Sequence, residues 1–214
     1  MLISLVMTRN PVFIHPDMSI HEVRSLMDKQ NIGHLPVLDK NNNLIGLVTK
    51  ADLLKAGPSG ATSLDMYEIS YLLSKMTAKE VMEKAVVTVA ENECVEEAAR
   101  IMADNKIGCL PVMRGKLLVG IITDTDLFRV FVNAFGARHP GVRITCNIAE
   151  KPGQVAMISQ AIAEKGGNIV AFVTSEGDDL SRRRATLKIN GITLKDAETV
   201  FKGLNGVTLE DIRE

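Results

Sequence analysis

Two pairs of side chains in this sequence stand at a spacing that suits the binding of a polar ligand. Thr49 precedes Asp52, and Thr123 precedes Asp126, each pair lying where an apolar run gives way to an amphipathic one. A strand that feeds a helix through Thr-x-x-Asp leaves backbone N–H groups, a hydroxyl and a carboxylate at one helix N-terminus, which suits a ribose and a phosphate. The same spacing is a capping box, in which Thr caps the helix and Asp reaches back. The residue types alone leave both interpretations open.

The two Thr-x-x-Asp stretches belong to an internal repeat. Aligned with itself at a shift of 75 residues, the chain places Met7 on Met82 and Ile32–Val37 on Ile107–Val112. After one deletion in the turn at residues 40–43 the shift becomes 74, which places Gly46–Asp52 on Gly120–Asp126. Many matches in order, with a single gap in a turn, indicate two copies of one structural unit.

Each copy is expected to fold as a strand, a helix, two hairpin strands and a closing helix. The expected strands are 12–14, 35–38 and 44–48 in the first copy, with 86–89 opening the second; the helices are 19–30 and 94–105, followed by helices that begin at Lys50 and Asp124. Ser19 and Glu22 form a capping-box pattern, whereas Cys94 at the equivalent position predicts a weaker helix start. Because about 60 residues bury little apolar surface alone, we expect the copies to pack together around a pseudo-twofold axis.

The repeat also sets the expected domain boundaries. A Gly- and Pro-rich break at residues 57–61 is followed by a capping-box pattern that predicts a linker helix over 62–75. We assign residues 1–57 to the first copy, 58–76 to the linker helix, 77–135 to the second copy and 142–214 to a C-terminal domain.

The repeated motifs resemble the CBS domain, arranged in tandem as a Bateman module. The resemblance rests on Met-Thr-x-x-Pro-Val at Met7–Val12, on two Gly-x-Leu-Pro-Val segments, and on the doubled Thr-x-x-Asp. It implies clefts for AMP, ADP, ATP or another adenosine compound, in which Asp holds the ribose hydroxyls and Thr lies near the phosphate. The implied first site uses Val12, His34, Pro36, Thr49, Lys50 and Asp52, and the implied second site uses Val87, Cys109, Pro111, Thr123 and Asp126.

The two implied sites differ in charge. Lys50 follows Thr49, whereas Asp124 follows Thr123. A cation there favours a polyanion and a carboxylate opposes one, so we expect the first site to take a phosphorylated nucleotide and the second to be weaker or suited to a neutral adenosine. The alternative is that both side chains point to solvent.

The C-terminal segment has a different pattern. Strands at 142–149, 168–175, 183–189 and 207–212, with helices at 155–165 and 193–204, predict a βαββαβ order, that of a ferredoxin-like α+β unit. The segment resembles an ACT domain, whose implied effector loop is Glu150, Pro152 and Gly153, with Asn168 on the second strand. This resemblance implies side-by-side dimerisation and an amino-acid ligand. The whole order resembles acetoin-utilisation proteins of the AcuB type.

Several function classes are disfavoured. The formal net charge of −1 has no basic face for nucleic acid, and no apolar run is long enough for a membrane span. Three widely spaced cysteines favour a reducing compartment, and together with an N-terminus unlike a signal peptide they lead us to expect a cytoplasmic protein. We find no metal-ligand spacing and no nucleophile–base pattern, and expect no enzyme.

Two interpretations of function remain. The first is a homodimeric regulatory sensor that binds an adenosine compound between the copies and acts on a partner protein. The second is a structural adaptor, in which the Thr/Asp pairs are only helix caps and the C-terminal domain dimerises. His34 either contacts the ligand or fills the entrance of its strand, and Cys109 is a redox sensor or, more in keeping with its sequence neighbours, a buried inert thiol.

Overall fold

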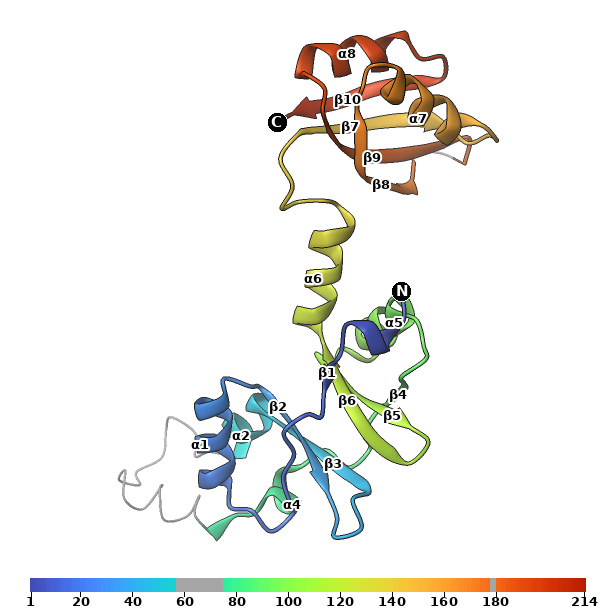
Figure 1. Cartoon of the computed structure of the whole chain (residues 1–214). Helices are drawn as coiled ribbons and strands as arrows, with labels where there is room; N and C mark the ends of the chain where they lie inside the picture. Colours follow the sequence, from blue (N-terminus) through green and yellow to red (C-terminus); the bar gives the residue numbers. More distant parts are fainter. Residues whose placement is uncertain (57–74, 178–179) are drawn as a thin grey trace. The chain divides into compact units, whose positions relative to one another are not determined.

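The computed structural model describes residues 1–56, 75–177 and 180–214, and divides the chain into two compact units. The first unit is Met1–Leu127 and the second is Phe128–Glu214 (Figure 1). The linker helix expected over residues 58–76 lies outside the described residues except at its last two positions.

The first copy of the repeat forms the elements that the sequence predicts. They are α1 (Ile20–Gln30), β2 (His34–Leu38), β3 (Leu44–Thr49) and α2 (Lys50–Ala56). At the start of α1 the Ser19 side chain accepts a hydrogen bond from the backbone N–H of Glu22, whose carboxylate accepts one in return, so the predicted capping box is formed. In the hairpin turn Asp39 Oδ1 accepts hydrogen bonds from two backbone N–H groups, each at 2.8 Å.

The second copy repeats this arrangement. Its elements are β4 (Val89–Ala90), α5 (Val95–Asn105), β5 (Cys109–Arg114), β6 (Leu117–Thr123) and α6 (Asp124–Ala134). Cys94 at the start of α5 makes no side-chain capping hydrogen bond, as its residue type predicts. Both α1 and α5 end on a left-handed residue, Asn31 and Lys106 respectively, so the two copies share even this backbone turn.

The segment that enters each copy pairs with the other copy. The N-terminal residues form η1 (Ile3–Leu5) and β1 (Thr8–Arg9), and β1 adds to the edge of β6 in the second copy. In the same way the residues after α4 (Ala78–Val81) reach the first copy, where Glu83 exchanges backbone hydrogen bonds with Leu47 of β3. This exchange of segments was not predicted from the sequence.

Because of this exchange, two of the expected strands do not form as predicted. Residues 12–14 make only an isolated bridge, from Ile14 to Val37, and residues 86–89 contribute only Val89 to β4. At this point each segment passes from the other copy back to its own copy. Only one or two of its residues therefore pair in parallel with a strand of its own copy. The copies also share a small apolar cluster that contains Leu47, Cys109 and Ile121 with Val86 beside it, consistent with the expected packing between the copies.

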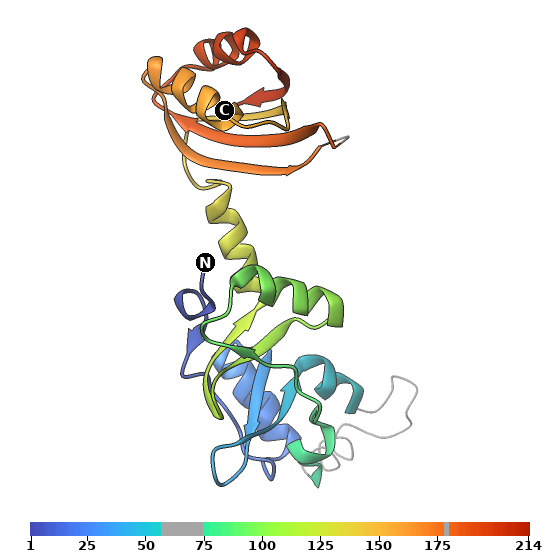
Figure 2. The same cartoon turned by 90° about the vertical axis from the view of Figure 1, so that its right-hand side faces the viewer.

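The second unit has the βαββαβ element order that the sequence predicts. Its elements are β7 (Val142–Ala149), α7 (Gln154–Glu164), β8 (Asn168–Glu176), β9 (Arg182–Asn190), α8 (Leu194–Gly203) and β10 (Val207–Arg213). The antiparallel sheet has the order β10-β7-β9-β8, and both helices cover one face of it (Figures 1 and 2). Alternate residues of β9, from Ala185 to Ile189, point into the core beneath the helices.

No helix in the described part of the chain is long and apolar enough to cross a membrane.

Candidate functional site

Both Thr–Asp pairs form complete capping boxes. The backbone N–H and the hydroxyl of Thr49 donate to Asp52 Oδ2 at 2.9 and 2.7 Å, and the Asp52 N–H donates to Thr49 Oγ1 at 3.3 Å. Thr123 and Asp126 repeat this geometry, with the first two distances at 3.0 and 2.8 Å. The helices α2 and α6 therefore begin where the sequence predicts, directly after each threonine.

A cleft of about 530 Å³ lies beside the first Thr–Asp pair, between the two copies. Its walls come from four segments: the start of β2, the end of β3 with α2, the exchanged segment before β4, and the junction of α5 with β5. The lining residues are Gly33, His34, Leu47, Thr49, Lys50, Ala51, Asp52, Lys55, Glu83, Ala85, Val86, Val87, Lys106, Ile107, Gly108 and Cys109. The cleft is thus built by both copies, and each copy contributes both charged and apolar residues to it.

The residues that the sequence assigned to two separate sites are grouped differently in the structure. His34, Thr49, Lys50 and Asp52 line the cleft as one group, together with Val87 and Cys109, which had been assigned to the second site. The backbone pairing between Leu47 and Glu83 is the reason, because it carries the segment that contains Val87 against the first copy.

The remaining predicted residues do not line this cleft. Pro36 and Pro111 are buried within β2 and β5, and Val12 is exposed before its isolated bridge. Thr123 lies at the end of β6, and Asp126 is buried in the first turn of α6. The prediction had taken each site from within one copy, whereas this cleft is lined by residues of both copies.

Five charged residues line the cleft. Lys50, Lys55 and Lys106 are cationic, and Asp52 and Glu83 are anionic. Sequence reasoning missed Lys55, Glu83 and Lys106, since none of them belongs to a repeated motif. The one available signal for Lys106 was its place just before the Ile-Gly segment of the second copy.

His34 lies at the meeting point of the two copies. A Cβ atom on Gly108 would be 3.7 Å from His34 Nε2 and 3.4 Å from Asp124 Oδ2, so the imidazole and this carboxylate flank the same glycine. Burial lowers the pKa of His34, and the carboxylates of Asp124 and Asp52 oppose that shift. The ring is therefore neutral at pH 7 and able to accept a hydrogen bond.

The Cys109 thiol is not a nucleophile. Burial, with the carboxylates of Asp124 and Asp52 adding to it, raises its pKa to about 12. A thiolate is required for redox or nucleophilic chemistry, so the interpretation of Cys109 as an inert buried thiol is favoured. Within the described residues no three His, Cys, Asp or Glu side chains are placed to hold a metal ion.

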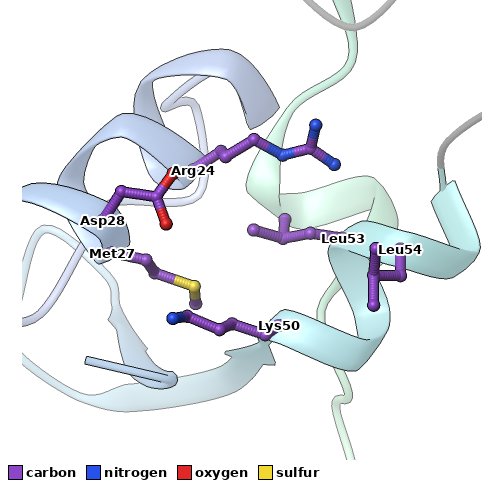
Figure 3. A pocket seen from close by; sticks show the side chains of 6 residues that line it. All are labelled: Arg24, Met27, Asp28, Lys50, Leu53 and Leu54. Atoms are coloured by element: carbon purple, nitrogen blue, oxygen red, sulfur yellow. The ribbon is translucent and has the colours of Figure 1, made fainter. Parts of the chain in front are cut away.

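Lys50 also borders a second, smaller pocket. This pocket of about 210 Å³ lies between α1 and α2 and is lined by Arg24, Met27, Asp28, Lys50, Leu53 and Leu54. Figure 3 shows the Lys50 side chain extending from the start of α2 toward Met27 and Asp28 on α1. Its ammonium group is thus directed toward α1.

The predicted effector residues of the second unit are not gathered in one place. Glu150 forms an ion pair with Arg183 on β9, whereas Asn168 begins β8 opposite Asn190 at the other end of β9. Seven residues of extended strand separate Arg183 from Asn190, a distance of roughly 23 Å. Pro152 is exposed, and Gly153, with φ of +89°, precedes α7. One copy of the chain therefore does not bring the loop and Asn168 together.

The fold of the first unit is that of a tandem pair of β-α-β-β-α motifs with a ligand-sized cleft between them. The family model for the CBS domain matches residues 3–59 and 78–133, which is more than half of the chain. The chain belongs to the CBS-domain family.

Solved structures of CBS-domain pairs resemble the first unit. The CBS domain pair of protein MJ0100, in complex with 5′-methylthioadenosine and S-adenosyl-L-methionine, is 29% identical with a TM-score of 0.53, covering 65% of this chain and 98% of that one. A protein from Vibrio cholerae that carries the name acetoin utilization protein (AcuB) is 33% identical with a TM-score of 0.53, at the same coverage. CBSX2 in complex with AMP is 28% identical with a TM-score of 0.50, covering 61% and 96%.

Curated relatives are longer proteins. L-aspartate semialdehyde sulfurtransferase of Methanocaldococcus jannaschii is 30% identical over 61% of this chain and 23% of its own length. Inosine-5′-monophosphate dehydrogenase of Staphylococcus aureus is 27% identical over 78% of this chain and 32% of its own length. The chain thus spans less than a third of these relatives.

Proposed function

We propose that this chain is a regulatory sensor that binds an adenosine compound, such as AMP, ADP or ATP, in the cleft between its two CBS motifs. The observation that carries the proposal is the cleft itself, which joins Thr49 and Asp52 of one copy to Val86 and Val87 of the other. Two similar CBS pairs are known in complex with such compounds, one with 5′-methylthioadenosine and S-adenosyl-L-methionine and one with AMP.

The cleft residues suit the parts of an adenosine. Val86, Val87 and Ile107 supply apolar surface for the base. Asp52 uses Oδ2 in the capping box, which leaves Oδ1 to accept hydrogen bonds from the ribose hydroxyls. Capping and ligand binding therefore coexist on this carboxylate, and the neutral ring of His34 adds a hydrogen-bonding group at the boundary between the copies.

The signal passes from the cleft to the second unit and to a partner protein. In this proposal the second unit is an ACT-like domain through which two copies of the chain form a homodimer, and an amino acid is a further ligand of that domain. Its βαββαβ order and the sheet order β10-β7-β9-β8 support this assignment. The strand β8 at one edge of the sheet offers backbone groups for pairing with a second copy.

The similarity to the Vibrio cholerae protein supports a role in acetoin or butanediol utilisation. The three widely spaced cysteines favour the cytoplasm as the place of this role. The matched pair of CBS domains supports a regulatory role and not a catalytic one. A ligand of micromolar affinity contributes about 8 kcal/mol, and a complete switch from 1:99 to 99:1 requires about 5.5 kcal/mol of that to differ between states. A partial shift of population is therefore the expected response.

Isothermal titration calorimetry of the full chain with AMP, ATP, adenosine and S-adenosylmethionine tests the proposal. We expect saturable heat with at least one of these compounds and a matching increase in the unfolding temperature, because a ligand that binds only the folded state stabilises it. Absence of both heat and thermal shift with every compound refutes ligand sensing.

That negative result supports the adaptor, which one observation favours. Both Thr–Asp pairs form complete helix caps, as the adaptor interpretation requires. An adaptor is expected to form the same homodimer in light scattering, with or without nucleotide.

A further inference from the structure

We propose that Met82 is an oxidation site, and that a peroxide converts its thioether to a sulfoxide that releases the exchanged segment from the first copy. Met7 is the equivalent residue at the other exchanged segment. This modification requires no ligand in the cleft, because it acts on the packing by which each copy receives a segment of the other.

The first unit contains two equivalent contacts between a methionine and a glycine. A Cβ atom on Gly46 of β3 would clash with Met82 Sδ. A Cβ atom on Gly120 of β6 would clash with Met7 Sδ in the same way. The repeat aligns the two methionines with each other and the two glycines with each other. In both contacts a sulfur atom from one copy therefore lies directly against the backbone of a hairpin strand in the other copy.

The two methionines differ in exposure. Met82 is partly exposed, whereas Met7 is buried and retains 9% of its accessible surface. A dissolved oxidant has to touch the sulfur atom, so we expect Met82 to react before Met7. The same argument places Met1, which is 61% exposed, before Met82, and leaves the fully buried Met27 unoxidised.

The reaction is a two-electron oxidation of the thioether by hydrogen peroxide or another hydroperoxide. A lone pair of Met82 Sδ attacks one peroxide oxygen, and the S–O bond forms as the O–O bond breaks. With hydrogen peroxide, the released hydroxide takes the proton from the transferred oxygen and leaves as water. The product is methionine sulfoxide, which is polar and chiral where the thioether was apolar.

The surroundings of Met82 do not suit a sulfoxide. The side chain packs on the apolar core of the first copy, and a polar oxygen buried there without a donor is costly. The adjacent backbone donors are already used. The N–H groups of Leu47 and Glu83 donate to each other's carbonyl oxygens at 3.0 and 2.9 Å, and the Met82 N–H donates to Ala78 O at 2.9 Å. The oxidised side chain therefore has to turn toward water and leave Gly46.

Loss of this contact affects the wall of the cleft. Glu83, which follows Met82 directly, pairs with Leu47 of the first copy. The same segment continues to Val86 and Val87, which line the cleft. Oxidation of Met82 therefore loosens a wall that the second copy contributes, and makes the proposed sensor responsive to oxidants.

Treatment of the full chain with hydrogen peroxide, followed by peptide mass mapping and thermal unfolding, tests the inference. We expect one added oxygen atom on Met82 and a fall of about 5 °C in the Tm of the first unit. Methionine sulfoxide reductases for both epimers, supplied with a dithiol, should restore the Tm. Met82→Leu keeps a similar apolar volume without an oxidisable sulfur, so it should prevent the loss of Tm.

The matched control is Met1→Leu, at an exposed methionine outside the two contacts, which should not protect the Tm. A Cys94→Ser background removes the partly exposed thiol, so that its oxidation does not contribute. Three results would overturn the proposal: no oxygen on Met82 under conditions that fully oxidise Met1, an unchanged Tm after full oxidation of Met82, or the same loss of Tm in Met82→Leu as in the wild type. The first two are read on a chain that keeps Met82, so they do not depend on how well Met82→Leu folds.

Discussion

Gly46 lies close against the side chain of Met82, and this packing allows a quantitative prediction. A Cβ atom on Gly46 would lie 2.8 Å from Met82 Cγ and 3.1 Å from Met82 Cβ, closer than side-chain atoms pack. The methionine cannot retreat by rotating only its tip, because the clash includes its Cγ. Overpacking of this kind costs about 1–3 kcal/mol, so we expect Gly46→Ala to destabilise the first unit by about 2 kcal/mol.

The measurement is urea or thermal unfolding of the full chain, monitored on the transition of the first unit. A loss of about 2 kcal/mol lowers the Tm by roughly 6–10 °C for a unit of this size. In a Met82→Ala background the contact with Cγ is removed and only the tight contact with Cβ at 3.1 Å remains, so the same Gly46→Ala change should then cost only about 0.5 kcal/mol. The double-mutant cycle should give a coupling energy of about 1.5 kcal/mol.

The control is Gly33→Ala, where no atom lies within 4 Å of the added methyl group. It should change stability little, or raise it slightly by restricting the unfolded chain. A Gly46→Ala variant as stable as Gly33→Ala, or penalties from Gly46→Ala and Met82→Ala that add without coupling, would refute the exchange of segments on which the cleft depends.

Three further predictions concern the site. Asp52→Ala and Asp126→Ala should each lose about 1 kcal/mol of stability, because they remove equivalent helix caps. Asp52→Ala should nevertheless weaken nucleotide binding at least about tenfold more than Asp126→Ala in calorimetry. Equal losses of binding would contradict the expected difference between the two Thr–Asp pairs. The pKa of His34 is lowered on folding, so the unfolded chain binds more protons and stability should fall as pH decreases from about 7 to 5. His34→Gln should flatten this pH dependence of the unfolding temperature. An unchanged slope would exclude His34 as the source of the pH dependence. Thiol titration with a chromogenic disulfide at pH 8 should modify the partly exposed Cys94 rapidly and Cys109 only after unfolding. The reason is that burial raises the pKa of Cys109 to about 12. Rapid reaction of Cys109 would contradict its burial.

Local sequence signals were sufficient for the regular elements. The capping pattern at Ser19 and Glu22 placed the start of α1, and the apolar runs placed β7 at the residues observed. These predictions succeed because a cap or an alternating run depends on neighbours a few residues away. The two-residue strand β1 was not predicted and β4 was expected three residues too early, since the existence of both depends on a partner strand and not on their own residues.

The sequence by itself determined that the chain contains two equivalent copies of a repeat, each with a Thr-x-x-Asp motif before its last helix. A repeat with matched motifs is visible without coordinates. It also selected Thr49 and Asp52, which line the cleft, as candidate binding residues. Only the tertiary structure decided the other side of that site. Backbone pairing of Glu83 with Leu47 carries Val87 across to the first copy, and the turn after α5 places Lys106 at the same cleft. Such neighbours are set by pairing between distant segments, which the local pattern of residues does not encode.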